Sequence, residues 1–333
     1  MTDTAGGSTA STPLAPPTLH DIYVARERIA PYLTRTPLLR HPLLDEATGL
    51  TIWVKHENHN PTCAFKVRGG LNLVAAMTPE ERSRGIVTAS TGNHGQSFGL
   101  ASRIHRVSCT VFVPNGNNPE KNAAIRAYGA TLEEGGKDFD EARERCEARA
   151  IQTGARYVHS GDEPLLIAGV GTYALEVFEE LPDADVVFVP IGGGSGACGL
   201  ITVRNALGAK AKIIGVGAVN APAVYQSWKG PSRVVGTSAD TLAEGVATRH
   251  SFDLPFSIYK PYLDDFVQLT EEELAAGVRM ALKTTHNLAE GAGAASIAAA
   301  YKMREQLAGQ RVVCIMSGGN LDAAKLKWVL GSA

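Results

Sequence analysis

The sequence has few of the features that mark nucleic-acid-binding or membrane-spanning proteins. Its 333 residues carry 32 basic and 34 acidic side chains, so the formal net charge is −2, and lysine and arginine form no cluster. Without a basic patch, we expect no binding to nucleic acid or to an anionic membrane surface. No apolar run reaches the roughly 20 residues that a membrane-spanning helix needs. The sequence therefore predicts neither partner.

Cysteine is also scarce. The five cysteines form no CxxC pair and follow no regular spacing, which argues against a disulfide framework and a structural zinc site. They are Cys63, Cys109, Cys146, Cys198 and Cys314. Residues 1–18 lack a basic start and a continuous apolar core, so we expect a disordered tail and not a signal peptide. These features together favour a cytoplasmic location.

What the sequence does contain is an alternation of short β-branched runs with helical patterns. The runs lie at residues 85–90, 108–114, 185–191, 212–217 and 311–316. Continuous apolar strands between helices indicate a parallel sheet that is covered on both faces, so the predicted fold class is α/β. Residues 75–156 contain their own strand–helix alternation. We therefore expect a small domain there, inserted between residues 19–74 and 157–333 of a larger one.

The stretch NPTCAFKVRGG, residues 60–70, places a lysine at an unusual position. Apolar residues recur at helical spacing from Leu71 to Met77, so a helix can begin soon after Pro61 with Lys66 in its first turns. The helix dipole makes that end locally positive, so the pKa of Lys66 should fall and its amine should become a better nucleophile. An exposed surface lysine is the alternative interpretation.

A second segment, VPIGGGSGACG at residues 189–199, leads from a predicted strand through glycines into a helix that begins near Ala197. Inward-facing backbone amides and the helix N-terminus can bind a phosphate there without a basic side chain. Residues 194–199 also match the GxGxxG pattern of dinucleotide binding, which requires an acid about 20 residues further on. Residues 215–220 contain no acid, so a phosphate monoester fits better. A turn that serves only tight packing is the alternative.

Two further loops follow predicted strands. ASTGNHGQ, residues 89–96, gathers two hydroxyls, an amide and free helix N–H groups, which suits a carboxylate, although it also suits an ordinary helix N-cap. IMSGGN, residues 315–320, places Ser317 at the carboxyl edge of the sheet, where open α/β sheets bind their ligands. We therefore expect three ligand-binding loops and Lys66 on one face of the molecule.

Four motifs in this order resemble those of fold-type II pyridoxal-phosphate enzymes, in the branch of threonine and serine dehydratases and serine racemase. They are PTCAFKVRG from Pro61, STGNHGQ from Ser90, GGGSG from Gly192 and SGGN from Ser317. The resemblance runs from about residue 20 to 322. It implies two parallel-sheet α/β domains with the active site between them, pyridoxal 5'-phosphate as the cofactor, an amino-acid substrate and a homodimer.

The resemblance also implies roles for individual residues. Lys66 would form the Schiff base with the cofactor and act as the base at Cα, and Asn93 would hydrogen-bond the 3-hydroxyl of the cofactor. The other cofactor-binding residues would be Phe65, Gly192, Gly193, Gly194, Ser195, Gly196 and Ser317. The substrate carboxylate would be bound by Ser90, Thr91 and His94.

The implied reaction is β-elimination by a dehydratase, or ammonia-lyase, which converts a β-hydroxy-α-amino acid of the L-threonine or L-serine type to a 2-oxo acid and ammonia. Ser317 at the pyridine nitrogen favours prompt loss of a β-substituent over a long-lived carbanion. His94 fits this branch, because β-replacement enzymes typically have threonine there. Thr91 stands where serine racemase has its second acid–base residue, so a racemase or β-replacement enzyme is an alternative. A NAD-dependent oxidoreductase is a distant third, supported only by the GxGxxG pattern.

Three departures from the family pattern refine the prediction. Threonine dehydratases commonly have phenylalanine where HSGDEP, residues 159–164, has Gly161, so we expect a larger pocket and a bulkier substrate such as a 3-aryl-serine. Residues 217–224, GAVNAPAV, lack the carboxylates of the divalent-metal site in the racemase-like branch, so we predict no metal. The chain stops soon after Asn320, which predicts no regulatory domain and favours a catabolic role.

Overall fold

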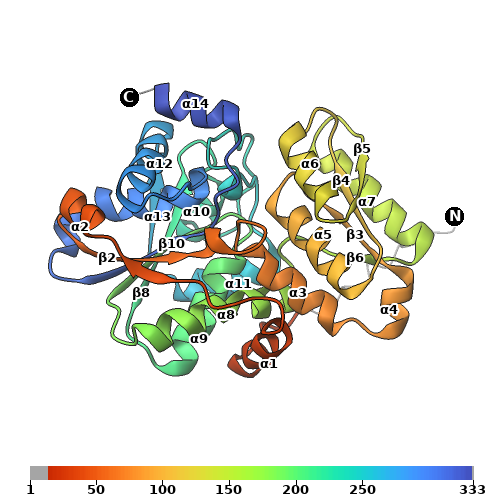
Figure 1. Ribbon diagram of the computed structural model, residues 1–333, viewed down its shortest axis with the longest axis horizontal. Helices are drawn as coiled ribbons and strands as arrows, with labels where there is room; N and C mark the ends of the chain where they lie inside the picture. Colours follow the sequence, from red (N-terminus) through yellow and green to blue (C-terminus); the bar gives the residue numbers. More distant parts are fainter. Residues whose placement is uncertain (1–13, 332–333) are drawn as a thin grey trace, which may run out of the picture.

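The computed structural model describes residues 14–331, which form two α/β units side by side (Figure 1). Residues 1–13 of the predicted tail lie outside the described residues. At its end, the Thr18 side chain accepts a hydrogen bond from the backbone N–H of Asp21, in a capping box that begins α1 (Leu19–Ile29). The first helix of the described chain therefore begins at Leu19.

The larger unit is built on a six-stranded sheet. In the order in which they lie, its strands are β1 (Leu38–Arg40), β2 (Thr51–His56), β10 (Arg311–Met316), β7 (Val186–Pro190), β8 (Lys212–Ala218) and β9 (Asp265–Leu269). Neighbouring strands run parallel, except that β1 pairs with β2 in the antiparallel direction. The carboxyl ends of the five parallel strands therefore meet at one edge of the sheet.

Helices cover both faces of this sheet, as the run of apolar residues in β7 requires. Val186 and Phe188 belong to the core cluster on the side of α12 and α13, whereas Val187 and Val189 belong to the cluster on the side of α8 and α9. Successive residues of a strand point to opposite faces, so a doubly covered strand must be apolar throughout. The helices are α2 (Pro42–Thr48), α8 (Pro164–Glu180), α9 (Ser195–Leu207), α10 (Ala223–Lys229), α11 (Asp253–Tyr262), α12 (Glu271–Thr285), α13 (Gly291–Lys302) and α14 (Ala323–Gly331).

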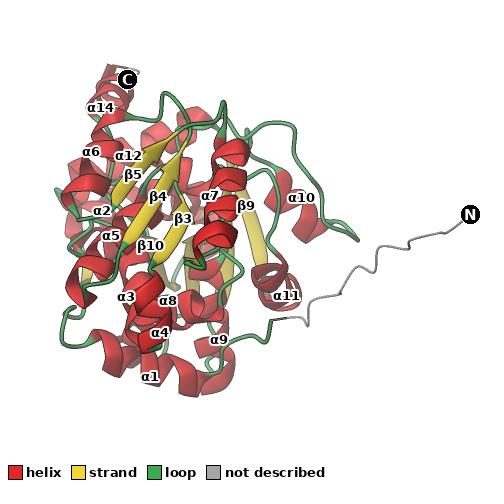
Figure 2. Ribbon diagram, turned by 90° about the vertical axis from the view of Figure 1, so that its right-hand side faces the viewer, coloured by secondary structure: helices red, strands yellow, loops and turns green. Residues whose placement is uncertain are grey.

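The smaller unit has a four-stranded parallel sheet. Its strands are β5 (Thr131–Glu134), β4 (Cys109–Val113), β3 (Ile86–Ala89) and β6 (Arg156–Tyr157). Figure 2 shows α5 and α6 on one side of these strands and α7 on the other. Its helices are α4 (Pro79–Arg84), α5 (Asn93–His105), α6 (Pro119–Ala127) and α7 (Phe139–Thr153), and α3 (Lys66–Ala76) leads into it from the larger unit. Because β6 pairs with β3, the expected domain limit at residues 156 and 157 runs through a strand of the smaller sheet.

Helix α3 lies between the two units and packs against α5 on one side and α8 on the other (Figure 1). Its contact with α5 is close, since a Cβ on Gly70 would collide with the Ser97 hydroxyl. That hydroxyl donates to the Lys66 carbonyl oxygen at 2.7 Å. The first turn of α3 is therefore fixed at the junction of the two units.

All five predicted β-branched runs form strands, namely β3, β4, β7, β8 and β10, and the predicted α/β class with two parallel-sheet units is confirmed. The connecting 3-10 turns are η1 (Glu57–His59), η2 (Glu244–Val246) and η3 (Arg304–Leu307). Among residues 14–331, no helix combines the length and the apolar character that crossing a membrane requires.

Candidate active site

A cavity of about 710 Å³ lies where the two units meet. Twelve of the predicted site residues line it: Phe65, Lys66, Ser90, Thr91, Asn93, His94, Gly192, Gly193, Gly194, Ser195, Gly196 and Ser317. The smaller unit contributes the loop after β3, and the larger unit contributes the loops after β7 and β10. These loops follow the carboxyl ends of parallel strands, where open α/β sheets place their ligands. Of the predicted site residues, only Gly161 is not part of the lining.

Lys66 is the first residue of α3, as the sequence predicts. Its Nζ donates a hydrogen bond to Ser195 Oγ at 3.1 Å, and no carboxylate in the described chain contacts it. Burial lowers the pKa of Lys66 to about 8. The direction agrees with the sequence-based expectation, and loss of solvation is the main cause. At pH 7 about one in ten of these amines is neutral and nucleophilic, far more than for an ordinary lysine.

The segment before Lys66 is fastened to the loop after β10. The backbone N–H of Phe65 donates to the Ser317 carbonyl oxygen at 3.0 Å, and Ala64 forms an isolated antiparallel bridge with Gly318. This pairing brings the Lys66 helix and the SGGN motif to the same wall of the cavity. It joins two motifs that are separated by about 250 residues of sequence.

The glycine loop after β7 forms a cradle at the N-terminus of α9. This helix begins at Ser195, two residues before the expected start at Ala197, and Gly194 precedes it with φ of 88°, a backbone conformation that favours glycine. A Cβ on Gly192 would collide with the Gly245 carbonyl oxygen. The first N–H groups of α9 have no intrahelical acceptor and the helix dipole adds positive potential, so the loop suits a phosphate.

Some polar groups of the loop after β3 form hydrogen bonds within the loop. Ser90 Oγ accepts hydrogen bonds from the backbone N–H groups of Gly92 at 3.2 Å and Gly95 at 2.8 Å, as a capping side chain does. Thr91 lines the cavity. Thr91 and the free amides at the start of α5 are therefore the groups that can reach a carboxylate.

His94 is held in a neutral state. Its Nε2 is hydrogen-bonded to the Thr88 hydroxyl at 3.0 Å, and its ring packs edge-on against Phe98 with the centroids 4.9 Å apart. Burial, together with the nearby Lys66, holds the pKa of His94 well below its usual value. Because Nε2 is occupied by Thr88, Nδ1 is the ring atom that remains for a ligand.

Asn93 is oriented by two partners on the larger unit. Its Nδ2 donates to Glu290 Oε1 at 2.8 Å, and its Oδ1 accepts from Asn320 Nδ2 at the same distance. Burial raises the pKa of Glu290. Asn320 was not singled out from the sequence, although it stands in the SGGN motif and motif position could have identified it. These contacts fix the amide of Asn93 at the mouth of the cavity.

An ion pair joins the two units beside this amide. Lys121 on α6 donates to Glu244 on η2, and both residues line the cavity. Lys325 binds the same carboxylate from the start of α14. Sequence inspection gave Lys121 no role, because its partner lies 123 residues away and no local pattern connects them.

The space beside Gly161 is filled by an aromatic ring. A Cβ on Gly161 would lie within 2.8 Å of three ring atoms of Phe252, which itself lines the cavity. Gly161 therefore adds no room to the cavity, and the expectation of a larger pocket at this position is not met. The ring that occupies this space comes from a segment about 90 residues further along the chain.

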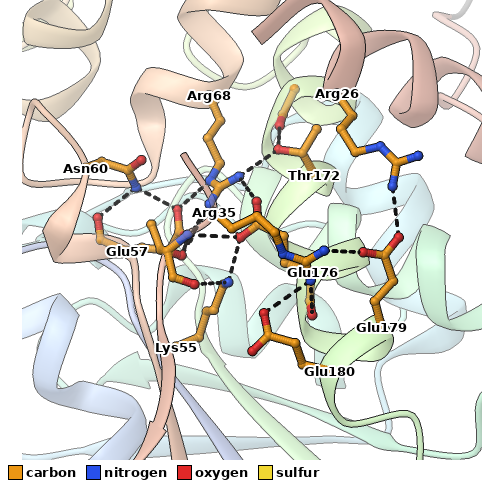
Figure 3. Close-up of polar contacts among 12 residues, drawn as sticks. Arg26, Arg35, Lys55, Glu57, Asn60, Arg68, Thr172, Glu176, Glu179 and Glu180 are labelled. Atoms are coloured by element: carbon orange, nitrogen blue, oxygen red, sulfur yellow. Dashed lines mark hydrogen bonds and ion pairs between the residues drawn. The ribbon is translucent and has the colours of Figure 1, made fainter. Parts of the chain in front are cut away.

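A fully buried ion network lies beneath the start of α3 (Figure 3). Arg68 donates to Glu57 at 2.7 Å and 2.9 Å, and to both carboxylate oxygens of Glu176 at 2.7 Å and 2.9 Å. Lys55 Nζ donates to the same Glu176 carboxylate at 2.6 Å. Burial lowers the pKa of Arg68, but the two carboxylates outweigh burial and raise it. The network joins β2, η1, α3 and α8, and so fixes the helix that carries Lys66.

Comparison of the chain with known protein families distinguishes between the candidate cofactors. A family model described as pyridoxal-phosphate dependent enzyme matches residues 29–318. The chain belongs to this family. The predicted family and cofactor are thereby confirmed.

The similar proteins within the family fall in the predicted branch. The chain is 37% identical over 305 residues to L-threonine ammonia-lyase of Thermotoga maritima, covering 92% of this chain and 76% of the relative. The crystal structure of a threonine deaminase from T.th. has a TM-score of 0.87 and 33% identity, covering 92% of this chain and 99% of that one. Maize serine racemase has a TM-score of 0.89 and 26% identity, covering 96% and 98%.

The residues of the cavity fit the cofactor of the family. The glycine cradle at α9 suits its phosphate, and Lys66 offers an amine with a lowered pKa for its aldehyde. Among residues 14–331, no group of three or more His, Cys, Asp or Glu side chains is arranged to hold a metal ion.

Proposed function

We propose that this chain is an ammonia-lyase that acts on L-threonine or L-serine and releases a 2-oxo acid. The observation that carries the proposal is Lys66, an amine with a pKa of about 8 that faces the glycine cradle and the loop after β3 in one cavity. The names of the similar proteins, L-threonine ammonia-lyase and threonine deaminase, support the same reaction.

Pyridoxal phosphate, when bound, supplies an electron sink for the charge released at Cα. The amides of Gly193 to Gly196 would hold its phosphate, Asn93 would contact its 3-hydroxyl, and Ser317 would face its pyridine nitrogen. Phe65 would lie beside the ring. These assignments use only residues that line the cavity.

The residues of the chain would divide the remaining work. Neutral Lys66 would remove the proton from Cα, and the Ser195 hydroxyl at 3.1 Å would hold the resulting ammonium. Thr91 and the amides of the loop after β3 would hold the substrate carboxylate, and so would orient the Cα–H bond toward Lys66. His94 would not hold it directly, because the Thr88 hydroxyl donates to Val158 and accepts from Nε2, which leaves Nδ1 of the neutral ring an acceptor. Ser90 would act by holding this loop in shape.

The net reaction balances without an oxidant or a metal. The substrate loses its β-hydroxyl as water, and the water that returns at Cα displaces ammonia. L-Threonine therefore gives 2-oxobutanoate and ammonium, and L-serine gives pyruvate and ammonium. We place this activity in amino-acid catabolism.

The test is 2-oxo acid and ammonia release by the purified protein, supplied with cofactor, from L-threonine, L-serine, L-threo-3-phenylserine and 3-hydroxyaspartate. We expect equal amounts of both products from L-threonine or L-serine, and none from Lys66→Ala. A wild-type protein that binds the cofactor but releases no 2-oxo acid from any of the four would refute the dehydratase proposal.

Amino-acid racemisation is a second candidate, because the Thr91 hydroxyl is a second group in the cavity that can exchange a proton. The similarity to maize serine racemase supports it. Chiral analysis of the substrate that remains after partial conversion separates the two: a racemase accumulates the D-isomer, whereas a pure ammonia-lyase does not.

We also propose domain limits, an oligomeric state and a cellular location. We assign residues 19–74 and 157–333 to the large cofactor-binding domain and residues 75–156 to the small one, with β6 shared at the limit. A homodimer follows from the family resemblance, and sedimentation would measure it. A cytoplasmic location suits the five cysteines, which are all free thiols.

A further inference from the structure

Phe252, in the segment before α11, lines the cavity beside Gly161, a position that the sequence around Gly161 does not reveal. A Cβ on Gly161 would lie within 2.8 Å of Cδ2, Cγ and Cε2 of Phe252, a separation that no real side chain tolerates. The rigid ring cannot move aside there as the end of a flexible side chain can. A side chain at position 161 and the present ring of Phe252 therefore exclude each other.

The ring of Phe252 is held on several sides. A Cβ on Gly193, in the phosphate cradle, would lie 3.0 Å from its Cε2 atom. The rings of His159 and His250 pack edge-to-face against it, with centroid distances of 4.7 Å and 5.1 Å and interplanar angles of 88° and 87°. Such contacts give an aromatic ring a defined orientation. The position of Phe252 is therefore set by the protein and does not depend on a ligand.

Backbone hydrogen bonds fasten the two segments that meet at this ring. His159 Nδ1 accepts the N–H groups of Gly161 at 3.1 Å and Asp162 at 2.8 Å. The Asp162 carboxylate in turn accepts the N–H of Leu254 at 2.8 Å. The loop before α8 and the start of α11 thus form one unit, with Phe252 enclosed between them.

The place of this unit in the cavity indicates what it contacts. One wall, with Lys66 and the glycine cradle, is assigned to the cofactor, and a second, the loop after β3, to the substrate carboxylate. Residues 114–118, 137–140 and 247–250 line further parts of the cavity, but the wall that adjoins the glycine cradle at Gly193 is formed by residues 157–160 and Phe252. A substrate whose Cα lies near Lys66 would direct its β-substituent toward that wall. This step rests on the proposed function.

We propose that Phe252 is the residue that limits the size of the β-substituent, and that it does so as a pair with Gly161. An aromatic ring at position 161 or at position 252 fills the same volume. The pair therefore accounts for a small β-hydroxy amino acid as the substrate, and the glycine at position 161 does not by itself admit an aryl group.

The test compares kcat/KM for L-threo-3-phenylserine with kcat/KM for L-threonine in the holoenzyme. Phe252→Ala is expected to raise this ratio by at least about tenfold, since pocket volumes of this size discriminate on that scale. Phe252→Leu, which preserves packing better, is expected to raise it less. The exchanged pair Gly161→Phe with Phe252→Gly is expected to return the ratio to within about threefold of the wild type.

A binding measurement distinguishes an effect of Phe252 on side-chain size from an effect on catalysis. L-Phenylalanine and L-alanine have no β-leaving group, and their dissociation constants follow from changes in cofactor absorbance. Phe252→Ala is expected to tighten L-phenylalanine relative to L-alanine by about tenfold. Phe256→Ala is the matched control, because Phe256 lies one turn further on in α11, packs against Tyr259 and does not line the cavity. It is expected to leave both ratios unchanged.

Ratios that stay within twofold of the wild type in both Phe252→Ala and Phe252→Leu would overturn the assignment of Phe252. An equal increase in Phe256→Ala would also overturn it, because the effect would then reflect general loosening. A wild-type enzyme that turns over neither amino acid would contradict the proposed function. The L-phenylalanine binding series would still decide whether Phe252 limits side-chain size.

Discussion

Lys66 and Arg68 lie two residues apart on α3, yet their side chains have opposite surroundings. Lys66 loses solvent without gaining a carboxylate, and its pKa falls to about 8. Arg68 loses solvent but gains Glu57 and Glu176, whose charges more than offset the burial that would lower its pKa. The comparison teaches that burial alone yields a reactive amine, whereas burial with paired carboxylates yields a structural cation.

Removal of the reactive amine should have the largest effect. Lys66→Ala is expected to lower kcat/KM at least about a thousandfold, because both the nucleophile and the base are lost. The free energy of unfolding of the apoenzyme should not decrease, since no ion pair is broken. Assays of 2-oxo acid release and urea unfolding measure the two quantities. A variant that unfolds more easily by several kcal/mol would mean that Lys66 is also a structural residue.

Removal of the structural cation should reverse this pattern. Arg68→Met leaves Glu57 and Glu176 buried beside a single remaining cation, Lys55, so the free energy of unfolding should fall by about 3–5 kcal/mol. Urea unfolding of the apoenzyme measures it. Arg26→Ala is the matched control, because Arg26 pairs with Glu179 at the surface with 45% of its side chain exposed, and its loss should cost less than about 1 kcal/mol. Equal losses in the two variants would contradict the contrast between the buried and exposed pairs.

The lowered pKa of Lys66 makes a prediction about pH. The neutral amine attacks the aldehyde of the cofactor, so the second-order rate of cofactor binding to the apoenzyme should be highest above pH 8. Below pH 8 it should fall about tenfold per pH unit, because protonation removes the nucleophile. Stopped-flow absorbance between pH 6 and 9.5 measures the profile, with the pH dependence of free cofactor and Nα-acetyllysine as the reference. A rate that still rises tenfold per pH unit up to pH 9.5 would show an ordinary lysine.

The smallest effect concerns the hydroxyl that contacts Nζ of Lys66. Ser195→Ala removes this hydroxyl, which accepts a hydrogen bond from the ammonium at 3.1 Å. The protonated form loses a stabilising contact, so the midpoint of the cofactor-binding profile should move down by less than about one pH unit. Ser195→Thr retains a hydroxyl and should restore the midpoint. An upward shift in Ser195→Ala would be inconsistent with this view of the site.

The parts of the fold that depend on local sequence were predictable. The apolar runs that form β3, β4, β7, β8 and β10, and the start of a helix near Lys66, follow from spacing alone. The surroundings of Lys66 and Arg68 could not be predicted from spacing, because they depend on residues far away in sequence. Arg68 meets Glu176 across 108 positions, and the ring that fills the space at Gly161 comes from position 252. A motif shows which residue is present. Tertiary packing decides whether a charge such as that of Arg68 is paired, and whether the space beside a glycine such as Gly161 is filled by another residue.

The order of strands in the larger sheet has a consequence for biosynthesis. Strand β10 lies between β2 and β7, so the last strand of the described residues to be synthesised occupies the middle of the sheet and supplies Ser317 and Gly318 to the wall beside Lys66. The strands of the smaller unit, by contrast, all lie between residues 86 and 157 and leave the ribosome well before β10. A nascent chain can thus complete the smaller unit while its cofactor site is still open, and the site closes only when β10 enters the sheet.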